Sequence, residues 1–171
     1  MYQGKRIARD FFTRDVLDVA PDLIGKNLTI TGNDGFPVRF PLTEVEAYRG
    51  HEDKACHASK GKTARTSVMF GEGGHLYVYL IYGMYWMLNI VTGTEGNPQA
   101  VLIRGVTGIS GPGKVTKRLS IDRSYYGEDL VISSRIWLED AGINPVYKTG
   151  PRIGIDYAGE YWKSVPWRFY I

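Results

Sequence analysis

Residues 76–89 read LYVYLIYGMYWMLN, and they are the most informative stretch of the chain. Four of the 12 tyrosines lie within it, at Tyr77, Tyr79, Tyr82 and Tyr85. A buried tyrosine hydroxyl needs a hydrogen-bond partner, whereas a tyrosine on a recognition surface can stack on a flat ring and still form hydrogen bonds. Taken alone, the stretch favours two core strands with an aromatic lining and a break near residues 83–84.

The sequence around this pair predicts further strands and a few helices. The predicted strands are residues 26–30, 36–48, 76–82, 85–92, 100–106 and one or two within 153–170, and the predicted helices are residues 11–25 and 111–119. Thr13 is the expected N-terminal cap of the first helix. Because strands and helices are segregated, we expect an α+β fold. A single domain over residues 1–171 would hold a curved, mostly antiparallel sheet with peripheral helices.

Composition and charge narrow the class of protein. Hydrophobic residues make up 43% and charged residues 23% of the chain, and the net charge is +3. This mildly basic character is compatible with a nucleic-acid partner but does not require one. The single cysteine, Cys56, excludes an internal disulfide and a cysteine-cluster metal site, and it favours a reducing, intracellular location.

Two stretches were candidates for targeting or membrane segments. Residues 1–10, MYQGKRIARD, lack the apolar core of a signal peptide. Residues 75–92 are long enough to cross a bilayer, but Gly83, Asn89 and four tyrosines interrupt them. A membrane span needs about 20 mostly apolar residues, so we expect no membrane partner.

The strongest catalytic candidate lies on the predicted strand 36–48. Val, Phe and Leu alternate along residues 38–42 and share one face, and unbroken alternation would place Glu44, Glu46 and Tyr48 on that same face. A carboxylate among apolar side chains has a raised pKa unless charges or hydrogen bonds compensate, which suits a general base that activates water. Two alternatives stay open here: a salt bridge from Glu46 to an arginine, and a glycosidase pair formed by Glu44 and Glu46.

Two other patterns carry weaker chemistry. His51, Cys56 and His57 lie near further acidic residues, but their spacing fits no usual zinc motif, so we expect no metal. Residues 108–115, GISGPGKV, nearly match a phosphate-binding P-loop. The final valine and the proline remove the magnesium ligand and a backbone donor, which argues against ATP. Lys114 remains a candidate contact to a DNA phosphate.

Seven motifs together resemble the alkyladenine (3-methyladenine) DNA glycosylase family. They are TEVEAY at 43–48, HASKGKTAR at 57–65, MFGEGGHLYVYLIYGMY at 69–85, NIV at 89–91, VLIR at 101–104, GPGK at 111–114 and PRIGIDYAGE at 151–160. The resemblance runs from about Phe12 to Ile171. It implies a monofunctional glycosylase that needs no cofactor. Such an enzyme would act on duplex DNA and excise damaged purines such as 3-methyladenine, 7-methylguanine, hypoxanthine and ethenoadenine.

The resemblance implies a role for each matching pocket residue. Glu46 corresponds to the general base that deprotonates the attacking water. Tyr48, His57 and Tyr79 correspond to the walls that stack on and hold a flipped base. Arg104 corresponds to a contact near the water and the target phosphate.

Other positions match residues that contact the duplex or select the base. Tyr82 corresponds to the side chain that wedges into the duplex, and Asn89 to the residue that clashes with the exocyclic amine of normal guanine. More weakly, we expect contacts with the DNA backbone from Arg65, Met84, Tyr85 and Lys114.

The chain departs from the family pattern between Arg104 and Gly111, where family members usually carry a longer segment, often helical. Ala64 and Thr66 also replace a usual proline and asparagine. No lysine is expected in the pocket, so we expect no lyase step. The protein is expected to be a monomer located wherever the cell keeps its DNA. A module that binds damaged or single-stranded nucleic acid without catalysis is the alternative.

Overall fold

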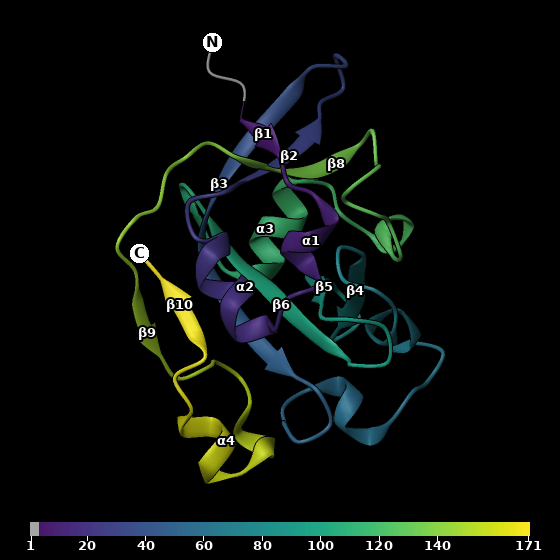
Figure 1. The fold of residues 1–171 in the computed structure, drawn as a ribbon, viewed down its shortest axis with the longest axis vertical. Helices are drawn as coiled ribbons and strands as arrows, with labels where there is room; N and C mark the ends of the chain where they lie inside the picture. The colour runs from purple at the N-terminus through teal and green to yellow at the C-terminus, as the bar shows by residue number, and fades with distance from the viewer. Residues whose placement is uncertain (1–3) are drawn as a thin grey trace.

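The computed structural model describes residues 4–171 and confirms the predicted α+β class (Figure 1). Residues 1–3 lie outside the described residues. They are the first residues of the expected domain and of the segment 1–10 that was compared with a signal peptide. The strands pair in the order β1 (Lys5–Arg6), β8 (Ile136–Asp140), β2 (Asn27–Thr31), β3 (Pro37–Arg49), β6 (Gln99–Val106), β5 (Tyr85–Thr92) and β4 (Leu76–Ile81). Each of these pairings is antiparallel. The short strand β7 (Ile109–Ser110) pairs with β6, and β10 (Arg168–Tyr170) pairs with both β3 and β9 (Lys148–Gly150).

The stretch 76–89 forms the predicted strand pair. β4 and β5 join through a tight turn in which the Met84 N–H donates to the Ile81 carbonyl at 3.1 Å. Val78 packs into the main core, whereas Tyr77 belongs to a second hydrophobic cluster beside it. The alternation expected of a strand therefore separates Val78 from the tyrosines on either side of it.

A β-bulge overturns the expected face of the carboxylates on β3. The pairing of β3 with β6 shifts register between Leu42 and Glu44 and again before Val45. Leu42 and Val45 therefore both enter the main core, although they are three residues apart. The prediction that Glu44 and Glu46 continue the Leu42 face is wrong, because the extra residue of a bulge reverses the alternation beyond it.

Short helices cover the sheet. α1 (Arg9–Phe12) and α2 (Val16–Leu23) replace the single helix predicted at 11–25. Thr13 ends α1, and Asp15 caps α2 by accepting a hydrogen bond from the Leu17 N–H at 2.9 Å, so the predicted Thr13 cap is wrong. α2 packs on β3, and α3 (Pro112–Arg118), which confirms the helix predicted near 111–119, packs on β5 and β6.

Residues 153–170 hold one strand, β10, in agreement with the one or two expected there. The rest of this stretch holds a 3₁₀ turn (Asp156–Ala158) and α4 (Glu160–Ser164), which were not predicted. The strand β8 was not predicted. Figure 1 shows α4 at the same end of the molecule as the loop that follows β3. That loop carries two further 3₁₀ turns, His57–Lys60 and Ser67–Phe70, and a fourth lies at Arg123–Tyr125.

Residues 75–92, considered from the sequence as a membrane span, contain the whole β4–β5 hairpin. Within residues 4–171, no helix combines the length and the apolar character needed to cross a membrane.

Candidate functional site

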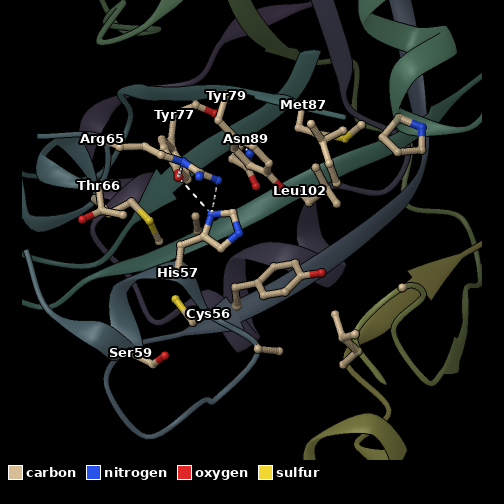
Figure 2. A pocket seen from close by; sticks show the side chains of 18 of the residues that line it. Cys56, His57, Ser59, Arg65, Thr66, Tyr77, Tyr79, Met87, Asn89 and Leu102 are labelled. Carbon is tan, nitrogen blue, oxygen red and sulfur yellow. Dashed lines mark hydrogen bonds between the residues drawn. The ribbon is translucent and has the colours of Figure 1, made fainter. Parts of the chain in front are cut away.

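A cavity of about 580 Å³ opens between the loop after β3, strands β4 to β6 and the segment before α4 (Figure 2). Its volume lies within the range of about 300–1,000 Å³ that is typical of ligand sites. The predicted pocket residues Tyr48, His57, Tyr79, Asn89 and Arg104 all line it. The structure therefore brings together residues from five separate sequence motifs.

Glu46 lies directly beneath this lining and is completely buried. Its Oε1 accepts a hydrogen bond from the Ile153 N–H at 2.7 Å, and the Arg104 Nε lies 3.5 Å from the same oxygen. Its Oε2 accepts a hydrogen bond from the Tyr48 hydroxyl at 2.8 Å. Its three partners line the cavity, so the carboxylate is one side chain away from a ligand held there.

Burial dominates the acidity of Glu46. Removal from water raises the pKa of Glu46 above its ordinary value of 4.5. Arg104, the Ile153 N–H and the Tyr48 hydroxyl lower the pKa and oppose only part of this effect. The carboxyl group therefore combines a high affinity for a proton with partners that also support its ionised form.

Glu44 has a different environment from Glu46. Its Oε1 lies 3.2 Å from the Arg104 Nε and 3.2 Å from an Nη of Arg168 on β10. Two arginines thus hold the Glu44 carboxylate as an ion pair. These ion pairs occupy the Glu44 carboxylate, and Glu44 is not among the residues that line the cavity.

The Tyr48 ring lies against a buried ion pair. The guanidinium of Arg152 lies 4.8 Å from the centre of that ring, close enough for a cation–π interaction. Arg152 also forms a two-pronged contact with Asp53, at 2.6 and 2.9 Å. Both charged side chains are fully buried.

His57 is held by Tyr77 and Arg65. Its Nδ1 lies 2.9 Å from the Tyr77 hydroxyl and 3.3 Å from an Arg65 Nη, which can only donate (Figure 2). Nδ1 is therefore the acceptor, and the proton of the neutral ring sits on Nε2. Burial, with Arg65 and Lys60 nearby, lowers the pKa of His57 to about 4, so the imidazole is neutral at pH 7.

Three aromatic rings form one wall of the cavity. The rings of His57 and Tyr79 meet edge to face with centres 4.7 Å apart, and those of Tyr77 and Tyr79 lie 5.1 Å apart. Arg65 covers the Tyr79 ring at 4.9 Å and donates to the Tyr77 hydroxyl at 3.2 Å. Arg65, expected on the DNA backbone, is thus tied into the cavity wall in this structure.

Asn89 is fixed deep in the cavity, with 4% of its surface exposed. Its Nδ2 donates to the Tyr77 carbonyl at 3.1 Å across the β4–β5 pair. Figure 2 places its amide beside Leu102 and Met87. A rigid polar group at this depth can reject a ligand by steric clash or by an unmatched donor.

The turn between β4 and β5 projects Tyr82 from the protein. Tyr82 is 84% exposed, and its φ of 52° lies in the left-handed region. Gly83 follows with a φ of 65°, so both central residues have the positive φ angles of a hairpin turn that usually prefers Asn-Gly. A bulky residue in this conformation is strained by about 1–3 kcal/mol, which points to a functional reason for the side chain.

The remaining predicted DNA contacts lie around this turn. Met84 is 65% exposed and Tyr85 is 47% exposed, and neither is part of the cavity lining. The Tyr85 ring packs on Gly113. A Cβ atom at position 113 would lie only 3.0 Å from this ring, so the close contact favours glycine. α3 therefore docks directly on the hairpin and presents Lys114, which is exposed, beside it.

Several residues of the site were not predicted. Ile153 supplies a backbone donor, and Arg152 and Asp53 form the ion pair behind Tyr48. Tyr157 lines the cavity and donates to the Ala55 carbonyl at 2.9 Å. The motif at residues 151–160 was the signal available for three of them, Arg152, Ile153 and Tyr157.

The lining also corrects one expectation. Lys54 and Lys60 line the cavity, although both are exposed, so the prediction of a pocket without lysine is wrong. His51, considered as a metal ligand, is not part of the cavity lining and packs against the Phe70 ring. Among residues 4–171, no three histidine, cysteine, aspartate or glutamate side chains gather as metal ligands.

Comparison with known proteins agrees with the sequence motifs. The family model described as Methylpurine-DNA glycosylase (MPG) matches residues 10–110 and 106–171. The two matched segments overlap at residues 106–110, which include the turn between β6 and β7.

Relatives align over nearly their whole length. A protein of Methanocella arvoryzae is 46% identical, and the alignment covers 96% of this chain and 91% of the relative. A protein of Wolbachia sp. subsp. Brugia malayi is 48% identical over 96% of both chains. A protein of Desulfitobacterium hafniense is 42% identical over 98% of this chain and 95% of the relative. Each carries 3-methyladenine DNA glycosylase in its name. The chain belongs to the methylpurine-DNA glycosylase (MPG) family.

Proposed function

We propose that this protein is a monofunctional DNA glycosylase that flips damaged purines out of duplex DNA and hydrolyses their N-glycosidic bond with a water activated by Glu46. The family match and the names of the relatives support a 3-methyladenine DNA glycosylase. The observation that carries the mechanism is the buried Glu46 carboxylate directly beneath an aromatic cavity. The proposed substrates are 3-methyladenine, 7-methylguanine, hypoxanthine and ethenoadenine.

The aromatic walls suit a base that has left the stack. Flipping a nucleotide costs a few kcal/mol of unstacking. Stacking on an aromatic side chain returns about 1–3 kcal/mol per base, so Tyr48, Tyr79 and the neutral His57 ring together can offset that cost. The electron-rich rings also favour alkylated purines, which carry a positive charge.

The proposed chemistry uses Glu46 as the base. The carboxylate takes a proton from water while the water oxygen attacks C1′ of the sugar, and the electron pair of the C1′–N bond departs with the purine. The two carboxylate oxygens can accept about four hydrogen bonds. Tyr48 uses one site at Oε2, which leaves another for water. The negative charge also stabilises the cation-like sugar in the transition state.

Two further residues supply selection and access. We propose that Asn89, pinned to the Tyr77 carbonyl, excludes normal guanine by a clash with its exocyclic amine. We propose that Tyr82 fills the gap left in the duplex, as wedge side chains do. Its exposure and strained backbone support this role. Arg65, Met84, Tyr85 and Lys114 remain proposed contacts with the DNA backbone.

A lyase step is not part of the proposal, although Lys54 and Lys60 line the cavity. Both amines are exposed to water, whereas amine nucleophiles are typically activated by desolvation or a neighbouring cation. We also propose that the protein is a single-domain monomer that acts where the cell keeps its DNA.

The experiment uses duplexes that each contain one defined lesion. The protein should release the damaged base, leave an abasic site without strand cleavage, and form no borohydride-trapped adduct with DNA. Lesion binding without release of any base would favour the alternative, a non-catalytic nucleic-acid-binding module. A trapped adduct would overturn the monofunctional assignment.

A further inference from the structure

We infer that the buried Asp53–Arg152 ion pair positions the catalytic carboxylate, because it fixes both the backbone donor and the aromatic side chain that hold Glu46. This inference rests on the proposed function of Glu46. Neither Asp53 nor Arg152 has a role in the chemistry described above, and both lie one layer behind the cavity.

The pair anchors the loop that follows β3. The Asp53 carboxylate accepts hydrogen bonds from the Arg49 and Ala55 N–H groups, each at 3.0 Å. It also accepts a hydrogen bond from each of the two Nη groups of Arg152, at 2.6 and 2.9 Å. Four donors therefore fix the carboxylate in one orientation.

Arg152 transmits that orientation to β3. One Nη donates to the Ala47 carbonyl at 3.0 Å, between Glu46 and Tyr48 in the sequence. The next residue along the chain, Ile153, donates its backbone N–H to Glu46 Oε1 at 2.7 Å. The guanidinium thus fixes the segment that presents this donor.

The same guanidinium supports the second partner of Glu46. It lies 4.8 Å from the centre of the Tyr48 ring and 5.1 Å from that of Trp167. Tyr48 donates its hydroxyl to Glu46 Oε2 at 2.8 Å. Without the guanidinium, the Tyr48 ring would lose its packing partner on the side away from the cavity and could move.

Stability alone does not account for this arrangement. Replacing a buried ion pair by packed apolar side chains is often neutral or stabilising, because desolvating two charges is costly. The Arg152 Nε is moreover one of three buried side-chain atoms in residues 4–171 without a hydrogen-bond partner. A buried pair that leaves a donor unmatched is better explained by the geometry that it imposes on Glu46.

The test compares Arg152→Lys with Arg39→Lys. Arg39 forms a comparable two-pronged pair with the buried Glu139, at 2.6 and 3.4 Å, away from the cavity. Both variants keep their charge and lose the planar fork. Their melting temperatures, single-turnover rates of base release and pH profiles are measured on a lesion duplex that the wild type processes.

We expect Arg152→Lys to release the base about 100-fold more slowly, since a small misplacement of a reacting group can cost that much. The acidic limb of its pH profile should move to higher pH, because Glu46 loses partners of its ionised form. Arg104 and Tyr48 contact this carboxyl group, with Arg152, Tyr79 and Tyr157 nearby, and all except Arg152 are unchanged in the variant. Arg39→Lys should lose stability without either effect.

Equal rates and superimposed acidic limbs for the two variants would overturn the inference. If Arg152→Lys does not fold, Asp53→Asn replaces it, and the Glu46 carboxyl carbon is titrated by NMR in [¹³C]glutamate-labelled protein. An unchanged Glu46 titration in that variant would overturn the inference without reference to activity. A wild type that releases no base from any lesion duplex would instead reject the proposed function.

Discussion

The Tyr48 hydroxyl donates a hydrogen bond to Glu46 Oε2 at 2.8 Å, so a wall of the cavity is joined directly to the buried carboxylate beneath it. Residues two apart on a strand point to the same face, and the bulge in β3 turns that face away from the core and toward the cavity. Recognition of a base and activation of water can therefore share one side chain.

Tyr48→Phe tests this link. The ring and its stacking surface stay, but Glu46 Oε2 loses a partner that favours its ionised form, so the pKa of Glu46 should rise further. We expect the acidic limb of the pH profile of base release to move up by about one pH unit, which corresponds to about 1.4 kcal/mol. An acidic limb at its original position would show that the hydrogen bond does not tune the carboxylate.

His57 should stay neutral down to about pH 4. The unfolded chain, with a histidine pKa near 6.5, binds the proton first. The neutral folded-state His57 therefore contributes fully to the free energy of unfolding above pH 6.5. This contribution is lost as the pH falls from 6.5 through about 4. Nitrogen NMR of labelled histidine should show the Nε2–H tautomer of His57 at pH 6. An imidazolium or the Nδ1–H tautomer would contradict the contacts with Tyr77 and Arg65.

Tyr82→Asn separates function from stability. Asparagine tolerates the left-handed φ of this turn, so we expect the free energy of unfolding to rise by about 1 kcal/mol. Affinity for a lesion duplex should fall, because the wedge is removed. Phe36→Asn, at an exposed aromatic residue in the turn between β2 and β3, is the control and should leave affinity unchanged. Wild-type affinity of Tyr82→Asn would argue against the wedge.

Asn89→Ala tests the proposed filter against normal guanine. The variant loses the side-chain hydrogen bond to the Tyr77 carbonyl, which should cost about 0.5–1.5 kcal/mol of stability. We expect slow release of undamaged guanine from duplex DNA, detected by chromatography of the free base. Absence of guanine under conditions where the variant still releases hypoxanthine would remove Asn89 from this role.

The sequence predicted those parts of the fold that local patterns determine. The β4–β5 hairpin follows from residues 76–89, in which two runs of apolar and aromatic residues are separated by a turn at Gly83. The motifs also led to seven of the residues that line the cavity: Tyr48, His57, Arg65, Tyr79, Tyr82, Asn89 and Arg104. Their roles remain predictions for the experiments above.

Features that depend on distant contacts were missed or mistaken. Perfect alternation along residues 38–48 hides the bulge, which arises where β3 pairs with β6 across the sheet. The Asp53–Arg152 pair joins residues 99 apart, and neither residue has a local signal that names the other. The segment 153–164 is rich in residues that suit strands, yet it turns back as short helices beside the cavity.

Glu46→Gln tests whether the Glu46 carboxylate activates water. The glutamine keeps the size of the side chain and an acceptor for the Ile153 N–H, but it cannot take a proton. Because burial raises the pKa of Glu46, ionisation costs stability as the pH rises from 4.5 through the folded-state pKa. The neutral variant should therefore be at least as stable as the wild type at pH 7.

The decisive measurement is single-turnover release of hypoxanthine from a duplex with one lesion, alongside the affinity for that duplex. We expect wild-type affinity for Glu46→Gln and a rate lower by at least about 100-fold, in line with the 10²–10⁴-fold contribution of a general base. Release at the wild-type rate by a folded Glu46→Gln variant would show that Glu46 does not activate the water.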